Sequence, residues 1–218
     1  LLHGWAFNSD IFHSLVDKYK ANFRVTVIDL PGHGRSDDID GDIESWCSEI
    51  IKLIPEKSTL VGWSLGGLLS TYLASKIDLK KLILVAATPC LVNNESWNYG
   101  INTEIFNQFA INLKNDSTKS LKRFVSLQSK DKSQLQELYK SIQKYPASMS
   151  ALNNGLEIII NSDLRDNYEK LTIPKAVILG SLDTLVPVKI KEWYDEAGST
   201  TSVIRSGHLP FLNKDFKL

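Results

Sequence analysis

A serine bracketed by glycines constrains the fold of this chain more than any other feature. Residues 62–66 are Gly-Trp-Ser-Leu-Gly, with the short β-prone run 58–61 before them and the apolar run 67–74 after them. A strand that turns abruptly into a helix exposes the Ser64 hydroxyl, provided that the flanking positions carry no side chain. The pattern therefore predicts a nucleophilic serine. The alternative is a glycine-rich turn whose serine takes no part in chemistry.

A serine hydroxyl needs a base to accept its proton and a third group to orient that base. The chain has four histidines, and only His208 follows Ser64 in the order nucleophile, acid, base. His208 comes after the strand-like run 201–205, and Asp183 comes after the apolar run 176–180. We therefore expect Asp183 to orient His208, and His208 to take the serine proton. The alternatives are a surface histidine and a turn carboxylate that caps the next segment.

Stabilising the negative charge of an attacked carbonyl requires two backbone N–H donors. We expect one from Leu65, which follows the serine, and the other from Trp5 in the early segment His3-Gly4-Trp5, where Gly4 permits close approach. His3 is either a second catalytic base or a residue that fixes this loop by hydrogen bonding. We favour the second role.

The rest of the chain alternates between strand-like and helical patterns, which is typical of an α/β fold with a mostly parallel sheet and helices on both faces. The expected strands cover residues 24–29, 58–63, 81–86, 175–180 and 201–205. The expected helices cover residues 41–54, 65–76, 102–114, 117–129, 132–144 and 148–161. From 93 to 167 only helical periodicity is found. We therefore expect a core of residues 1–92 and 168–218 with a helical cap insertion over 93–167.

Composition excludes several classes of protein. With 43% hydrophobic and 23% charged residues, the chain has an ordinary globular composition. No apolar run approaches the roughly 20 residues that a membrane span needs. The two cysteines, Cys47 and Cys90, predict neither a disulfide framework nor a metal site, and reduced cysteines suit a cytoplasmic protein. No phosphate-binding loop or metal-binding histidine pair is present, so we expect no cofactor and no metal.

The expected cap is basic. Residues 114–144 contain eight basic and three acidic residues, a net charge of +5, although the 25 basic and 25 acidic residues of the whole chain cancel. This asymmetry predicts an acidic partner at the cap, and the alternative is a solvated lysine-rich helix face. Nucleic acid is a poorer candidate because aromatic residues are not interleaved with the charges.

The chain resembles the α/β-hydrolase superfamily, and within it the pimeloyl-[acyl-carrier-protein] methyl ester esterase family of biotin synthesis. The matching segments run nearly from end to end: 2–6, 29–32, 62–68, 88–90, 123–128, 154–158, 163–165, 183–187 and 208–211. The catalytic segments are common to many hydrolases. The residues of 62–67, Pro89-Cys90, 123–128 and 154–158 point to this family.

The resemblance implies hydrolysis of a methyl ester on a chain tethered to acyl carrier protein, an acidic partner. It implies that Lys119 and Arg123 dock the carrier. Lys119 occupies a position where the family usually has an arginine, and lysine cannot make the planar two-point contacts of an arginine. It further implies substrate contacts at Trp5, Ser64, Leu65, Phe124, Val125, Ser126, Leu127, Gln128 and His208. For Phe124 and Leu127 the alternative is plain helix packing.

Other functions use the same triad. They are a general short-chain carboxylesterase, a carbon–carbon bond hydrolase or cofactor-free haloperoxidase, and a receptor or interaction module that retains the fold without catalysis. We expect a monomer. The chain opens on Leu1 without an initiator methionine and stops at Leu218, so we expect a partial chain that lacks the opening strand or hairpin and part of the closing helix.

Overall fold

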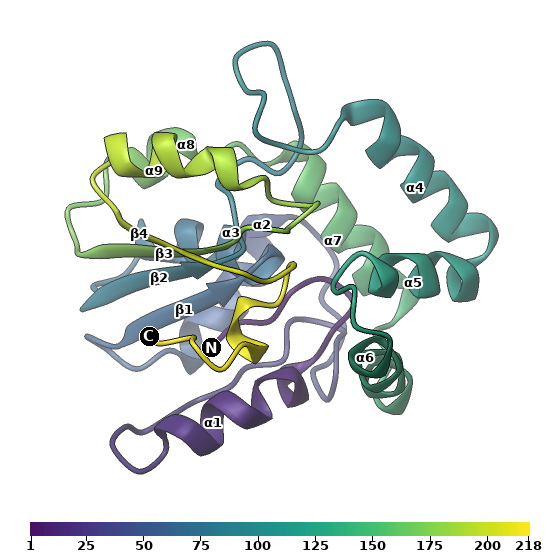
Figure 1. The fold of residues 1–218 in the computed structure, drawn as a ribbon, viewed down its shortest axis with the longest axis horizontal. Helices are drawn as coiled ribbons and strands as arrows, with labels where there is room; N and C mark the ends of the chain where they lie inside the picture. Colours follow the sequence, from purple (N-terminus) through teal and green to yellow (C-terminus); the bar gives the residue numbers. More distant parts are fainter.

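The computed structural model describes all residues from 1 to 218. A parallel sheet forms the centre of the protein. Its strands are β1 (Thr59–Trp63), β2 (Lys81–Val85), β3 (Lys175–Gly180) and β4 (Thr200–Ile204). They pair in the order β1-β2-β3-β4, and every pair is parallel (Figure 1). This arrangement confirms the α/β fold expected from the alternating pattern.

The strand expected over 24–29 is reduced to isolated bridges. Leu2 bridges Ile28 on one side and Gly62 on the other, both in parallel. Leu1 adds a hydrogen bond from its N-terminal nitrogen to the Thr26 carbonyl, at 2.7 Å. Because the segment pairs only with Leu1 and Leu2, it forms no continuous ladder, and the prediction of a regular strand there was wrong.

Nine α-helices accompany the sheet. They are α1 (His13–Tyr19), α2 (Ile43–Ile50), α3 (Leu65–Ala74), α4 (Thr103–Asn115), α5 (Ser117–Ser126), α6 (Lys132–Lys144), α7 (Met149–Asn161), α8 (Arg165–Glu169) and α9 (Lys191–Glu196). Helix α2 is shorter than expected, because Asp42 caps it by accepting the Ser45 N–H and its last turn tightens into a 3-10 helix over Ile51–Leu53.

The core has two halves, one on each face of the sheet. Successive strand residues point to opposite faces, so Leu82 and Leu84 of β2 pack in a cluster with residues of α2, α3 and α9. Ile83 and Val85 pack in a second cluster with residues of α1 and of the C-terminal segment. Helices therefore cover both faces of the sheet (Figure 1).

The connection between β2 and β3 contains α4, α5, α6 and α7, which lie together at one end of the sheet (Figure 1). Ser64 directly follows β1 and shares a cavity with residues of α4, α5 and α7. The boundaries of a separate cap at residues 93 and 167 stay a prediction. None of the helices has the length and hydropathy required to cross a membrane.

Candidate active site

Ser64 lies in a strained turn between β1 and α3. Its φ of 54° and ψ of −120° place it in a conformation that residues with side chains rarely adopt. The turn needs glycine on both sides. A Cβ at Gly62 would lie 2.3 Å from the Gly66 carbonyl oxygen, and a Cβ at Gly66 would lie 2.3 Å from the Leu2 carbonyl oxygen. The glycines thus allow the tight turn that presents the serine.

The three residues expected to form a triad meet in space. His208 Nε2 lies 2.9 Å from Ser64 Oγ, and His208 Nδ1 lies 2.7 Å from Asp183 Oδ2. The other carboxylate oxygen of Asp183 accepts the N–H groups of Leu185 at 2.8 Å and Val186 at 3.1 Å. The side chains of His208 and Asp183 are fully buried. This geometry suits a serine that passes its proton to an oriented imidazole.

His208 is also held through its backbone. The indole N–H of Trp63 donates to the His208 carbonyl at 2.7 Å, and the His208 N–H donates to the Gln128 carbonyl at 3.1 Å. A Cβ at Gly207 would lie 2.7 Å from that same Gln128 oxygen. The segment that follows α5 therefore positions the histidine loop, which the sequence motifs did not indicate.

Two backbone N–H groups near Ser64 are free to bind an anion. The Phe7 N–H closes the tight turn from Gly4 to Phe7 by donating to the Gly4 carbonyl. The Trp5 N–H, at the second position of this turn, donates to no protein acceptor. Leu65 is the first residue of α3, and its N–H has no intrahelical acceptor. Trp5 and Ser64 line the same cavity.

Two buried histidines hold the turn that contains Trp5. His3 Nδ1 lies 2.8 Å from the Gly4 carbonyl, and its Nε2 accepts the Leu30 N–H at 2.9 Å. His33 Nδ1 lies 2.8 Å from the Pro31 carbonyl, and its Nε2 accepts the Ala6 N–H at 3.3 Å. Each ring uses one nitrogen as donor and the other as acceptor, which requires the neutral form. The expected loop-fixing hydrogen bonds of His3 are thus present, whereas the role of His33 was not anticipated.

This arrangement predicts acid destabilisation. Burial lowers the pKa of His33 from 6.5 to about 4, and burial together with the neighbouring His33 lowers the pKa of His3 to about 3. As the pH falls from about 6.5 towards 4, the unfolded chain binds protons that the folded chain does not, so the free energy of unfolding decreases. Urea unfolding at a series of pH values should show this slope, and it should be shallower for His33→Gln. An equal slope in the variant would contradict the assignment.

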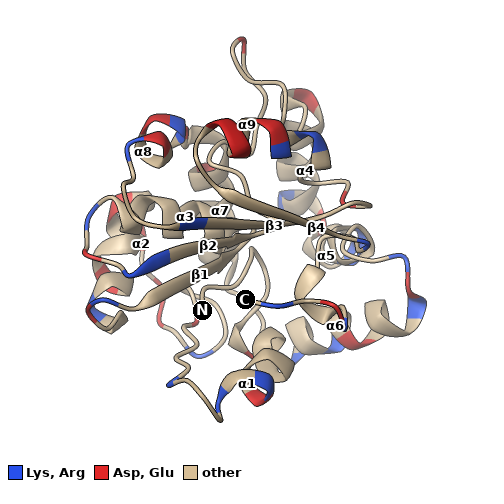
Figure 2. Cartoon of the chain, turned by 60° about the vertical axis from the view of Figure 1, so that its left-hand side comes forward, with Lys and Arg blue, Asp and Glu red and all other residues tan.

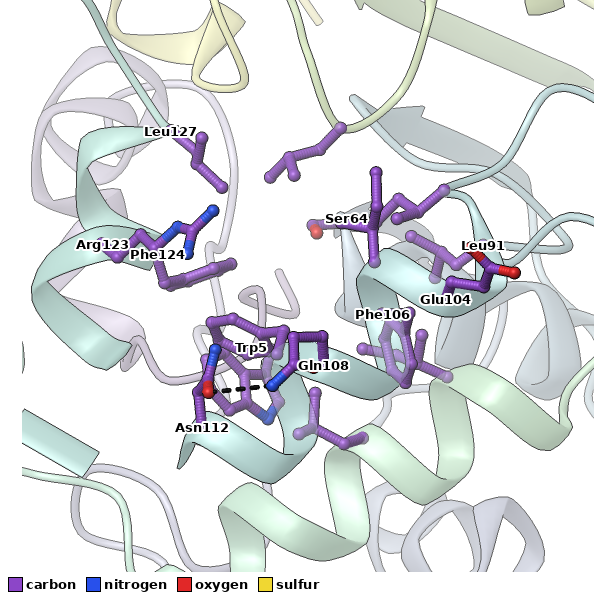
Figure 3. A pocket seen from close by; sticks show the side chains of 16 residues that line it. Trp5, Ser64, Leu91, Glu104, Phe106, Gln108, Asn112, Arg123, Phe124 and Leu127 are labelled. Atoms are coloured by element: carbon purple, nitrogen blue, oxygen red, sulfur yellow. Dashed lines mark hydrogen bonds between the residues drawn. The ribbon is translucent and has the colours of Figure 1, made fainter. Parts of the chain in front are cut away.

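A cavity of about 460 Å³ opens in front of Ser64. Figure 3 shows the serine hydroxyl pointing into it, with Arg123, Phe124 and Leu127 on the facing wall. Most of the lining is apolar, which suits an acyl chain. The lining residues are Trp5, Ser64, Leu91, Ile101, Glu104, Ile105, Phe106, Gln108, Phe109, Asn112, Arg123, Phe124, Leu127, Leu156, Ile159 and Leu185.

Of the segment 124–128, which was expected to contact substrate, some residues line the cavity and others do not. Phe124 and Leu127 line the cavity, whereas Val125 is buried in the core and Ser126 donates its hydroxyl to the Arg123 carbonyl. Gln128 is buried and does not line the cavity. The helical spacing of three residues explains why Phe124 and Leu127 share a face.

Most of the cavity lining was not identified from the sequence. Helix α4 contributes six of the 16 lining residues, including Ile105, Phe109 and Asn112, and the Gln108 side-chain amide donates to Asn112 Oδ1 at 3.1 Å. The amphipathic pattern of this helix was visible in the sequence. The sequence predicts that the apolar faces of the cap helices form the roof of an acyl pocket, but it does not identify which residues of α4 border that cavity.

The basic residues of 114–144 are all exposed, and none forms an ion pair with a carboxylate. Figure 2 shows basic positions on α5 and α6. Lys119 lies in the first turn of α5, and Arg123 lies one turn later at the edge of the cavity. The surface is therefore free to meet an acidic partner next to the cavity that Ser64 faces.

Neither cysteine has the lowered pKa of a nucleophilic thiolate. Burial raises the pKa of Cys47 to about 12 and that of Cys90 to about 11, so both stay protonated thiols. No group of three or more histidine, cysteine or carboxylate side chains converges as metal ligands would.

Comparisons with known proteins agree with this geometry. The model of the alpha/beta hydrolase family matches residues 1–216. A pimeloyl-[acyl-carrier protein] methyl ester esterase from Aliivibrio salmonicida is 33% identical over 224 residues, which cover 98% of this chain and 85% of that protein. The enzyme of the same name from Pectobacterium atrosepticum is 35% identical over 225 residues, covering 98% of this chain and 88% of that protein.

Solved structures share the fold. An esterase from Exiguobacterium antarcticum superposes with a TM-score of 0.88 at 25% identity, covering 97% of this chain and 84% of the esterase. A bromoperoxidase from Bacillus anthracis gives a TM-score of 0.86 at 22% identity, covering 95% of this chain and 83% of that one, which shows the fold alone. The chain therefore belongs to the alpha/beta hydrolase family, and its sequence relatives within that family include pimeloyl-[acyl-carrier protein] methyl ester esterases.

Proposed function

We propose that this protein is a serine carboxylesterase that hydrolyses the methyl ester of pimeloyl-[acyl-carrier protein]. The observation that carries the chemistry is the buried chain of hydrogen bonds from Ser64 through His208 to Asp183, at 2.9 and 2.7 Å. The named relatives support the substrate, because they match 98% of this chain. The role in biotin synthesis rests on the same resemblance.

The first half of the reaction forms an acyl-enzyme. Ser64 Oγ attacks the ester carbonyl carbon while His208 Nε2 takes the hydroxyl proton, and Asp183 stabilises the resulting imidazolium. The N–H groups of Trp5 and Leu65 bind the oxyanion of the tetrahedral intermediate. When the intermediate collapses, the bond to the methoxy group breaks and His208 gives its proton to the departing methanol.

The second half releases the acid. His208 removes a proton from a water molecule, which attacks the acyl carbon of the ester to Ser64. Collapse of the second intermediate returns the proton to Ser64 and frees the pimeloyl carboxylate. The apolar wall formed by Phe124 and Leu127 accommodates the methylene chain, while the other end of the chain stays attached to the carrier.

Carrier recognition is assigned to the exposed basic residues near the cavity. Lys119→Glu should raise KM for the carrier-bound ester by about tenfold, because a charge reversal at the rim slows association with an acidic protein. Turnover of a short p-nitrophenyl ester should not change. Lys80→Glu, an exposed lysine just before β2, is the matched control. Steady-state kinetics at low and high salt measure both effects.

Salt separates the proposal from its main rival. Turnover of the carrier-bound ester should weaken as salt rises, since exposed charges are screened, whereas turnover of the short ester should stay constant. A general short-chain esterase would show the same salt response for both esters and no effect of Lys119→Glu. That result would retain the serine esterase and reject the carrier as its partner.

A further inference from the structure

The side chain of Trp5 connects the turn from Gly4 to Phe7, which carries the proposed oxyanion donor, to helices α4, α5 and α7. Trp5 is 2% exposed, and its indole N–H donates to the Leu152 carbonyl of α7 at 2.9 Å. The ring also packs edge-on against Phe124 of α5 and Phe109 of α4, with distances between ring centroids of 4.8 Å and 5.6 Å, respectively. The indole is therefore held by three contacts, while the backbone N–H of the same residue has no protein acceptor and the residue lines the cavity that Ser64 faces.

Gly155 provides the room for this indole. It lies three residues after Leu152, on the same face of α7. A Cβ at Gly155 would lie 2.7 Å from Trp5 Cδ1 and 3.2 Å from Trp5 Nε1. The first distance is shorter than carbon atoms tolerate, so an added Cβ would push the ring away from α7, towards the cavity that Trp5 lines.

No backbone requirement explains a glycine at this position. Gly155 is in the interior of α7 and is not among the residues with positive φ. Glycine weakens a helix interior relative to alanine. Close approach of the Trp5 ring is the remaining reason, and it explains part of the 154–158 motif on which the family resemblance depends.

We propose that Gly155 is a positioning residue for the oxyanion hole: it lets the Trp5 indole seat on α7 and so fixes the direction of the Trp5 N–H. This inference rests on the proposed ester hydrolysis. The turn is then held from two sides. His3 and His33 bond its backbone on one side, and α7 holds its tryptophan on the other.

Gly155→Ala tests the inference. The added methyl group displaces the ring and tilts the Trp5 N–H, so kcat for a p-nitrophenyl ester should fall about 10- to 100-fold, less than the complete loss of an oxyanion donor because the N–H is misplaced and not removed. KM should change less than about threefold, because the ground-state ester makes little use of this donor. Glu157→Ala, on the exposed face of the same helix, is the matched control and should retain wild-type kcat.

Repeating the substitution in a Trp5→Ala variant tests whether Gly155 acts through the indole. In Trp5→Ala the backbone N–H remains but no ring is present to be displaced, so adding Gly155→Ala should cost less than about threefold further in kcat. An equal loss in both backgrounds would overturn the proposal. Wild-type kcat in Gly155→Ala alone would overturn it as well.

A spectroscopic readout covers the case in which Trp5→Ala does not fold. The indole 15N–1H resonance of Trp5, assigned by its absence in Trp5→Phe, should shift in Gly155→Ala and not in Glu157→Ala. An unchanged resonance would overturn the proposal. If the wild type hydrolyses the short ester but not the carrier-bound one, the proposed substrate fails while the role of Gly155 stands. A wild type that is inert towards both esters would overturn both.

Discussion

Ser64→Ala should lower kcat for any ester by a factor of about 10⁴ to 10⁶, because removing the nucleophile of a triad leaves only binding and oxyanion stabilisation. The fold should survive, since the substitution removes one oxygen from a residue that is already in place. Steady-state turnover of a p-nitrophenyl ester measures the loss, and circular dichroism checks the fold.

Ser75→Ala is the matched control for this variant. Ser75 is exposed at the C-terminal end of α3, and its hydroxyl contacts only the Tyr72 carbonyl. It should retain wild-type turnover and should react with a fluorophosphonate probe, whereas Ser64→Ala should not react. Turnover by Ser64→Ala within tenfold of the wild type would remove Ser64 from the mechanism.

Asp183→Asn should lower kcat by about 10⁴, with little change in stability. In this variant the side-chain carbonyl oxygen still accepts hydrogen bonds from the N–H groups of Leu185 and Val186, so the new amide NH2 faces His208 Nδ1. Nδ1 must then accept a hydrogen bond from this NH2 group, and the ring proton moves to Nε2. An Nε2 that carries a proton cannot take one from Ser64. Steady-state turnover of a p-nitrophenyl ester measures the loss, and urea unfolding measures the stability.

Asp166→Asn is the control for that substitution. The Asp166 side chain is 85% exposed, and its one ion pair is the contact of Oδ2 with Lys170 Nζ at 3.8 Å. This variant should keep both its turnover and its midpoint of unfolding. If Asp183→Asn kept wild-type kcat, Asp183 would not be the residue that orients His208, and another carboxylate would have to be sought.

The sequence predicted best the features that depend on local pattern. The strand–serine–helix unit around Ser64, and the helices α4 to α7, follow from hydrophobic periodicity and glycine placement within a few residues. The meeting of Ser64, His208 and Asp183 was also foreseeable, because parallel strands bring their carboxyl ends to one edge of the sheet.

Apart from the triad, contacts between residues distant in sequence were not foreseen. The acceptor role of His33 towards Ala6 depends on how two loops approach each other, and nothing in either loop indicates it. The Gln128 carbonyl holds His208 through the backbone, so residue type carries no signal. The regular strand expected near Ile28 failed because β propensity alone does not determine how many residues find a partner.

The most direct test of the proposed reaction is the mass of the carrier after incubation of pimeloyl-[acyl-carrier protein] methyl ester with the protein. Ester hydrolysis predicts a carrier lighter by one methylene group, with release of methanol and an intact thioester. Ser64→Ala should leave the mass unchanged. A carrier that keeps its full mass with the wild type, or that loses the whole acyl chain, would contradict the proposed function.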